Sequence, residues 1–192
     1  MIAIIKYNAG NIRSVQNALT RLGYESIITD NSDEIRRADK VIFPGVGEAG
    51  SAMRYLKEKN LDKLITSLGQ PVLGICLGLQ LMCSYSEEGN TNCLGIFNNT
   101  VSKFKGNEII PHMGWNNFEN IGGKLFYGIS VSDNVYFVHS YFADINDQTT
   151  ATCNYIKPFS AAIEKDNFYA TQFHPEKSAA IGEIILKNFL SL

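Results

Sequence analysis

The sequence lacks the features that mark membrane-spanning, secreted and nucleic-acid-binding proteins. No run reaches about 18 apolar residues, so no membrane-spanning segment is expected. The apolar start has no basic segment before it and is typical of a strand, so we expect no signal peptide. The 17 Lys and Arg residues, against 19 Asp and Glu, form no basic block, which argues against a nucleic-acid partner. We therefore expect a cytoplasmic protein.

Cysteine and histidine are also scarce, and their spacing does not suit a metal site. The 4 cysteines form no C-x-x-C pair, and the chain has only 3 histidines. Because zinc sites are built from such closely spaced pairs, no metal is expected. No dinucleotide fingerprint G-x-G-x-x-G follows the first predicted strand, so no cofactor is expected. Cys83, Cys93 and Cys153 are expected to pack as small apolar residues in a reducing compartment. Cys76 differs from them because of its neighbours.

The spacing of apolar residues predicts alternating strands and helices in the first half of the chain. A fully buried strand is expected at 2–6 and further strands at 25–29, 40–43 and 71–75. A turn is expected at 8–11 and helices at 12–22, 33–38, 53–68 and 77–84. The second half is expected to hold short strands at 101–110, 135–139, 151–155, 160–164 and 168–173, then a helix over 181–189. This order predicts an α/β fold with three layers, in which residues 1–192 form one domain around a largely parallel central sheet with additional mixed strands.

The segment G-I-C-L-G at residues 74–78 places Cys76 between a predicted strand and a predicted helix. It is the cysteine form of the nucleophile elbow, a sharp turn that crowds the residues two before and two after the nucleophile. The N–H groups that begin the next helix favour a thiolate. A buried cysteine beside glycines that only end a strand would give the same five letters, but the strand–turn–helix context favours a nucleophile.

A nucleophilic cysteine needs a base, and the base needs a group that orients it. His174 and Glu176 offer both, because side chains two apart in an extended segment point to the same side. The alternative is an ordinary His-Pro turn before the last helix, and it becomes the weaker hypothesis once the elbow is considered together with this segment. His112 and His139 have no carboxylate two residues on and are weaker candidates.

The segment P-G-V-G at 44–47 ends the third predicted strand, at the edge where doubly wound sheets bind ligands. Backbone N–H groups there can complete an oxyanion hole. An ordinary turn is the alternative, and a phosphate-binding loop is disfavoured because G-x-x-x-x-G-K-[ST] is absent. The glycines also let a peptide plane rotate at little steric cost, so Gly45, Val46 and Gly47 are expected to form a two-state switch that presents either a carbonyl or an N–H to the oxyanion.

The elbow with its continuation to Gln80, together with Q-F-H-P-E at 172–176, resembles the class I glutamine amidotransferases. Further blocks resemble the glutaminase subunits of imidazole glycerol phosphate synthases: Tyr7 with 10–15, then 44–47, P-H-M-G-W-N at 111–116 and Y-F-V-H-S-Y at 136–141. The blocks cover essentially the whole chain in the family's order. Lys6 stands where the family commonly has an acidic residue, and Ala179 where a glycine is common. These departures leave room for a paralogue that supplies ammonia to another synthase, for example in sugar amination.

The resemblance implies a flavodoxin-like fold and a glutaminase that hydrolyses L-glutamine to glutamate and ammonia. The ammonia would pass to a cyclase subunit that makes imidazole glycerol phosphate in histidine biosynthesis. The residues implied are Cys76, His174 and Glu176 for catalysis, Val46, Gly47 and Leu77 for the oxyanion hole, and Gly45, Gln80, Ser140 and Tyr141 for substrate binding.

The acceptor chemistry is expected on a separate chain. A (β/α)₈ barrel, the synthase half in this family, needs about 250 residues, more than the 192 that one α/β domain already uses. A heterodimer with such a barrel is therefore expected. A cysteine hydrolase of other amides and a catalytically silent binding subunit are the remaining alternatives, and the intact triad argues against the second.

Overall fold

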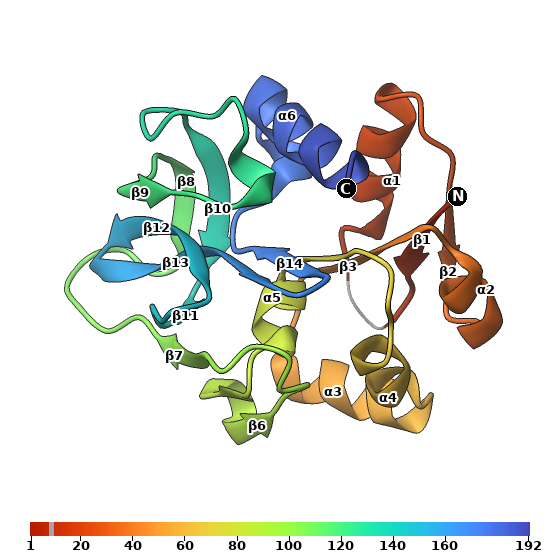
Figure 1. Cartoon of the computed structure of the whole chain (residues 1–192). Helices are drawn as coiled ribbons and strands as arrows, with labels where there is room; N and C mark the ends of the chain where they lie inside the picture. The colour runs from red at the N-terminus through yellow and green to blue at the C-terminus, as the bar shows by residue number, and fades with distance from the viewer. Residues whose placement is uncertain (8–9) are drawn as a thin grey trace.

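An eight-stranded sheet forms the middle layer of the structure, a computed structural model that describes residues 1–7 and 10–192 (Figure 1). The strand order is β2-β1-β3-β4-β14-β13-β12-β9. The parallel part consists of β2 (Ser26–Thr29), β1 (Ile2–Ile5), β3 (Lys40–Gly45), β4 (Val72–Cys76) and β14 (Phe168–Thr171). Antiparallel strands then extend the sheet: β13 (Lys157–Lys165), β12 (Thr149–Tyr155) and β9 (Asn120–Ile121). The predicted α/β class with a largely parallel sheet is confirmed.

Helices cover both faces of the parallel part, which gives the three layers seen in Figure 1. One face carries α1 (Ile12–Arg21) and α6 (Ala179–Leu190). The other carries α3 (Ala49–Glu58), α4 (Leu61–Thr66) and α5 (Leu77–Met82), and α2 (Ser32–Arg37) lies near the outer strand β2.

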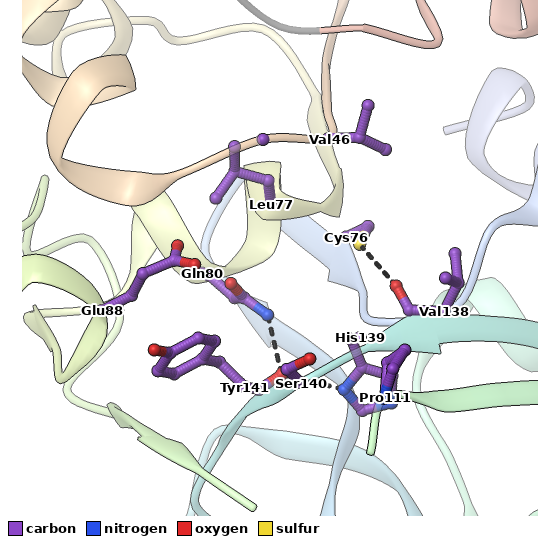
Figure 2. A pocket seen from close by; sticks show the side chains of 11 residues that line it. Val46, Cys76, Leu77, Gln80, Glu88, Pro111, Val138, His139, Ser140 and Tyr141 are labelled. Atoms are coloured by element: carbon purple, nitrogen blue, oxygen red, sulfur yellow. Dashed lines mark hydrogen bonds between the residues drawn. The ribbon is translucent and has the colours of Figure 1, made fainter. Parts of the chain in front are cut away.

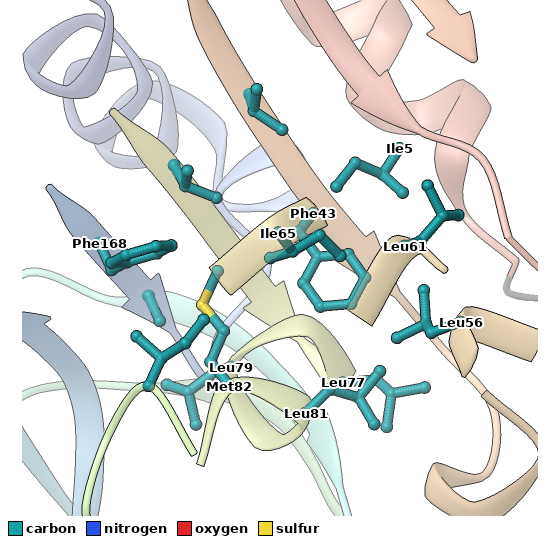
Figure 3. Packing of buried hydrophobic residues seen from close by; sticks show 14 of the residues in the cluster. Ile5, Phe43, Leu56, Leu61, Ile65, Leu77, Leu79, Leu81, Met82 and Phe168 are labelled. Atoms are coloured by element: carbon teal, nitrogen blue, oxygen red, sulfur yellow. The ribbon is translucent and has the colours of Figure 1, made fainter. Parts of the chain in front are cut away.

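Alternate residues of β1 enter different hydrophobic cores, because successive side chains of a strand point to opposite faces. Ile2 and Ile4 pack in the core shared with α1 and α6, whereas Ala3 and Ile5 pack in the core shared with α3, α4 and α5. Figure 3 shows Phe43 in this second core among side chains from those helices. Burial on both faces explains why β1, β3 and β4 are nearly continuous apolar runs.

Two smaller sheets stand beside the main one and come from the second half of the chain. One pairs β8 (His112–Asn116) with β10 (Val135–His139) in antiparallel orientation. The other joins β11 (Tyr141–Ala143), β7 (Thr100–Lys103), β5 (Tyr85–Ser86) and β6 (Thr91–Asn92). The structure also has three short 3₁₀ turns: η1 (Glu88–Asn90) between β5 and β6, η2 (Lys124–Phe126) between β9 and β10, and η3 (Pro175–Lys177) between β14 and α6. These sheets form the side of the molecule opposite β2.

Two predicted elements differ from the structure. The helix expected over 53–68 is broken into α3 and α4, because Asn60 takes a left-handed conformation with φ 54°. The strand expected over 101–110 ends at Lys103. The turn expected at 8–11 falls partly on residues 8 and 9, which lie outside the described residues. Among the residues described, no helix has the length and apolar character needed to cross a membrane.

Candidate active site

The candidate nucleophile lies at the carboxyl end of β4, where two strand ends meet. Cys76 is the last residue of β4 and pairs with Gly45 of β3, so the P-G-V-G segment lies directly beside it. The Cys76 backbone has φ 54° and ψ −106°, a combination that L residues rarely adopt. The chain then turns at once into α5. This is the strand–turn–helix geometry that a nucleophile elbow requires.

The two elbow glycines are fixed by contacts with neighbouring backbone. A Cβ atom on Gly78 would lie 1.9 Å from the carbonyl oxygen of Phe43, and one on Gly74 would lie 3.0 Å from the carbonyl carbon of Gly78. The first separation is shorter than any real Cβ contact, and the second is tighter than nearly all of them. The turn can therefore pack against β3 only when position 78 carries no side chain, and Gly74 lets β4 lie close to the start of α5.

His174 and Glu176 form a buried pair beside the cysteine. Nδ1 of His174 lies 2.8 Å from Oε1 of Glu176, and the hydroxyl of Ser178 donates to the His174 carbonyl at 2.7 Å. Burial lowers the pKa of His174, but the Cys76 thiolate and Glu176 outweigh that effect and raise the pKa to about 10. Nε2 of His174 has no hydrogen-bond partner among the described residues. An imidazolium with one free N–H is therefore favoured next to the sulfur.

Asn11, at the start of α1, adds a contact that the sequence analysis missed. Its side-chain amide donates to Oε1 of Glu176 and lies 3.4 Å from Nδ1 of His174. Asn11 therefore helps to hold the carboxylate that orients the imidazole. The sequence signal was membership in the 10–15 block, but no local pattern relates that block to Glu176, 165 positions away.

A cavity of about 270 Å³ opens beside Cys76 (Figure 2). Seven of the predicted site residues line it, namely Val46, Gly47, Cys76, Leu77, Gln80, Ser140 and Tyr141. The predicted Gly45, His174 and Glu176 do not line it. Gly45 instead packs against Tyr7, where a Cβ atom would lie 1.9 Å from the tyrosine hydroxyl oxygen.

Hydrogen bonds link the cavity wall to the cysteine. The side-chain amide of Gln80 donates to the Tyr141 carbonyl at 2.8 Å and to Oε1 of Gln172 at 3.1 Å, and the Gln172 amide points its Nε2 at Sγ of Cys76 at 3.7 Å. Figure 2 shows the Gln80 amide aimed at the Tyr141 backbone and the Cys76 thiol aimed at the Val138 carbonyl. Gln80 is thus a structural part of the wall.

Glu88 also lines the cavity, and the sequence analysis did not single it out. Burial, and to a smaller extent the Glu48 carboxylate, raise the pKa of Glu88, while the N–H of Ala49 donates to it at 2.8 Å. A carboxylate at the rim of a cavity is suited to receive an ammonium group. No motif in the sequence marks this position.

The peptide between Val46 and Gly47 has one defined orientation. The Val46 carbonyl accepts a hydrogen bond from the N–H of Gly10 at 3.3 Å. Because the C=O and N–H of a trans peptide point in opposite directions, the Gly47 N–H is turned away from Gly10. A rotation of this peptide would have to break the hydrogen bond to Gly10.

The other three cysteines have different surroundings from Cys76. Cys83 and Cys153 are buried, Cys93 is half-buried, and all are free thiols. Burial raises the pKa of Cys93 and of Cys153 to about 12, so both stay protonated at neutral pH. Among the described residues, no group of three or more His, Cys, Asp or Glu side chains is placed to hold a metal ion.

Comparison with known proteins gives consistent matches over the full chain. The model of the family "Glutamine amidotransferase class-I" matches residues 3–191. The imidazole glycerol phosphate synthase subunit HisH of Bacteroides fragilis (strain YCH46) is 58% identical over 100% of this chain and 99% of its own. The HisH subunit of Escherichia coli (strain K12) is 46% identical over the same shares. A solved glutamine amidotransferase has a similar fold, with a TM-score of 0.76 and 16% identity over 100% of this chain and 98% of its own.

The matched model and the fold define a class-I glutamine amidotransferase domain, as the resemblance of the motifs predicted. Within that class, the chain belongs to the family of HisH subunits of imidazole glycerol phosphate synthase. The expectation of an enzyme with glutaminase activity is confirmed by this membership.

Proposed function

We propose that this chain hydrolyses L-glutamine through Cys76, His174 and Glu176 and supplies the ammonia to a partner subunit that makes imidazole glycerol phosphate in histidine biosynthesis. The observation that carries the proposal is the elbow cysteine, which lies beside a buried imidazole–carboxylate pair and on the wall of a cavity. Relatives at 46% and 58% identity favour this acceptor over the alternative of another synthase. The reaction is proposed to take place in the cytoplasm.

The chemistry follows from the placement of the groups. The Cys76 thiolate attacks the side-chain carboxamide carbon of glutamine, and the oxygen becomes an oxyanion held by the N–H groups of Leu77 and Gly47. The free Nε2–H of His174 then protonates the nitrogen, the C–N bond breaks, and ammonia leaves a γ-glutamyl thioester. His174 next takes a proton from water, which attacks the thioester and releases glutamate and the thiolate. Glu176 holds the proton on Nδ1 throughout.

The amino-acid end of glutamine is proposed to lie against the other side of the cavity. The Ser140 and Tyr141 backbone offers polar groups there, and Gln80 holds that backbone in place. Glu88 is placed to receive the substrate ammonium group. Gly45 contributes by keeping the strand end close to the elbow, since it pairs with Cys76.

The partner is proposed to be a (β/α)₈-barrel subunit in a heterodimer. The outer face of β8 supports this, because Met113 and Trp115 lie two apart on the strand, point to the same side, and are 62% and 55% exposed. Grouped exposed apolar side chains mark interaction surfaces. Pro111, just before this strand, lines the cavity. Tryptophan is enriched at the energetic centre of interfaces. A partner seated on β8 would therefore cover the cavity from which ammonia leaves.

The test is a paired assay of the complex with glutamine or with ammonium salt as the nitrogen source. Cys76→Ala should lose product formation from glutamine and retain it from ammonium. The matched control is Cys93→Ala, a half-buried thiol that does not line the cavity, and it should retain both activities. Loss of both activities in Cys76→Ala would place acceptor chemistry on this chain and contradict the proposal.

A further inference from the structure

Two buried histidines that the mechanism does not use lie face to face on neighbouring strands. His112 of β8 and His139 of β10 are register partners, and each is about 95% buried, with exposed fractions of 4% and 5%. Nδ1 of His112 lies 3.0 Å from Nε2 of His139. Nδ1 of His139 in turn lies 2.8 Å from the carbonyl oxygen of Tyr141.

The direction of every hydrogen bond in this series is determined by the Tyr141 carbonyl at one end. A carbonyl oxygen only accepts, so Nδ1 of His139 carries the proton toward Tyr141. Nε2 of a neutral His139 then accepts, and Nδ1 of His112 must donate to it. The remaining Nε2 of His112 accepts from the side-chain amide of Asn116, 3.3 Å away. Both imidazoles are therefore the neutral Nδ1–H tautomer. Burial lowers the pKa of His112 to about 4 and that of His139 to about 3, in agreement with neutral rings.

The series of hydrogen bonds ends at Tyr141, which lines the cavity. The Tyr141 carbonyl accepts one bond from His139 and one from Gln80, so it is held from two sides. Ser140 and Tyr141 are both wall residues. The far end is held by stacking, because the His112 ring lies between Tyr155, at a centroid distance of 4.1 Å, and Phe137, at 4.8 Å.

We propose that His112 and His139 are positioning residues, a neutral two-imidazole relay that fixes the Tyr141 carbonyl and with it the Ser140–Tyr141 wall for glutamine. This assignment rests on the proposed function, in which that wall receives the amino-acid end of the substrate. The relay touches neither the sulfur nor the carboxamide. Its loss should therefore weaken glutamine binding and leave the bond-breaking steps nearly intact.

Two substitutions at His112 separate hydrogen bonding from packing. His112→Phe keeps a ring between Phe137 and Tyr155 but removes the donor to His139. His112→Asn removes the ring but places an amide N–H near the position of Nδ1. In the complex with the synthase partner, His112→Phe should raise KM for glutamine about tenfold with kcat within about twofold, since a buried acceptor is left unpaired. His112→Asn should recover at least about threefold of that loss in KM.

A role in packing alone predicts the reverse order, with His112→Asn worse than His112→Phe, and that order would overturn the relay. The histidine ¹⁵N and ¹³C chemical shifts of the unsubstituted full chain give a second measurement that needs no variant to fold. Both rings should be the Nδ1–H tautomer, and an Nε2–H tautomer at His139 would also refute the proposal. Absence of glutaminase activity in the unsubstituted complex would refute the proposed function instead, and the tautomers would still decide the relay.

Discussion

The three histidines have pKa values shifted in opposite directions. The Cys76 thiolate and Glu176 raise the pKa of His174 to about 10 against the effect of burial, whereas burial lowers the pKa of His112 to about 4 and of His139 to about 3. His174 therefore stabilises the fold most below pH 6.5, and that contribution is lost as the pH rises through about 10. His112 and His139 stabilise it above pH 6.5, and their contribution is lost as the pH falls toward 4 and 3.

The first prediction follows from the acid side of this balance. Between about pH 6.5 and 4, unfolded His112 binds a proton that folded His112 does not bind. The free energy of unfolding therefore decreases as the pH decreases through this range. Each such proton contributes a slope of up to about 1.4 kcal/mol per pH unit. His112→Phe should reduce the slope by about that amount, measured by urea unfolding at several pH values. The groups that face His112 are His139, Asn116, Phe137 and Tyr155. An unchanged slope would mean that folded His112 titrates normally.

At the scale of elements, the parallel core was predictable because both faces of β1, β3 and β4 are buried. Continuous apolar runs and helical spacing were enough to place β1, β3, β4 and α1 within one or two residues. The break between α3 and α4 was not predictable, because the sequence does not show whether Asn60 takes a left-handed or a helical conformation. The elbow was recognisable because its glycines are required locally. The contact of Asn11 with Glu176 and the pairing of His112 with His139 depend on strand and helix placement, which no local pattern contains.

The end of β3 gives the second prediction. A Cβ atom on Gly45 would lie 1.9 Å from the Tyr7 hydroxyl oxygen, a group that is buried without a hydrogen-bond partner among the described residues. Gly45→Ala should therefore lower the free energy of unfolding by about 1–3 kcal/mol and shift the oxyanion segment, which lowers kcat. Adding Tyr7→Phe should recover part of both losses, because it removes the clashing oxygen.

The control for this pair is Gly69→Ala, where nothing lies within 4 Å of the new methyl group. That variant should change stability by less than about 1 kcal/mol. If Tyr7→Phe gives no recovery in the Gly45→Ala background, the clash is relieved elsewhere and the tyrosine does not constrain the strand end. Circular dichroism melts and glutaminase turnover measure both quantities on the same samples.

At the scale of the whole molecule, the third prediction concerns control of the glutaminase by the partner. An uncoupled enzyme would waste glutamine, and Gly45, Val46 and Gly47 can reorient a peptide with little steric conflict. One oxyanion donor is worth about 10²–10³-fold in rate. Glutaminase turnover should therefore rise by up to that factor from the chain alone to the complex, and rise most with an acceptor analogue bound.

Agreement of the three rates within a few-fold would contradict the switch but not the triad. Trp115→Ala supplies the interface control, because its exposed side chain lies on β8 and outside the cavity wall. It should weaken assembly with the partner, measured by calorimetry, and should leave turnover at saturating partner close to that of the unsubstituted complex.

The backbone of Cys76 gives the last prediction. A non-glycine residue at φ 54° and ψ −106° carries strain of about 1–3 kcal/mol, which the surrounding elbow imposes. Glycine avoids that strain, so Cys76→Gly should be more stable to urea than Cys76→Ala by about 1 kcal/mol. Glycine is normally the worse of the two by about 0.5–1 kcal/mol in a strand or helix. The same pair of substitutions at Cys153, an interior residue of β12, should show that normal order.

The strain also bears on how such a chain changes over generations. Selection for thermal stability alone would favour glycine at position 76, and that substitution would remove the nucleophile and abolish activity. Laboratory selections that rank variants by melting temperature alone would likewise enrich inactive proteins with glycine at this position. The cysteine persists in this geometry only where turnover itself is under selection.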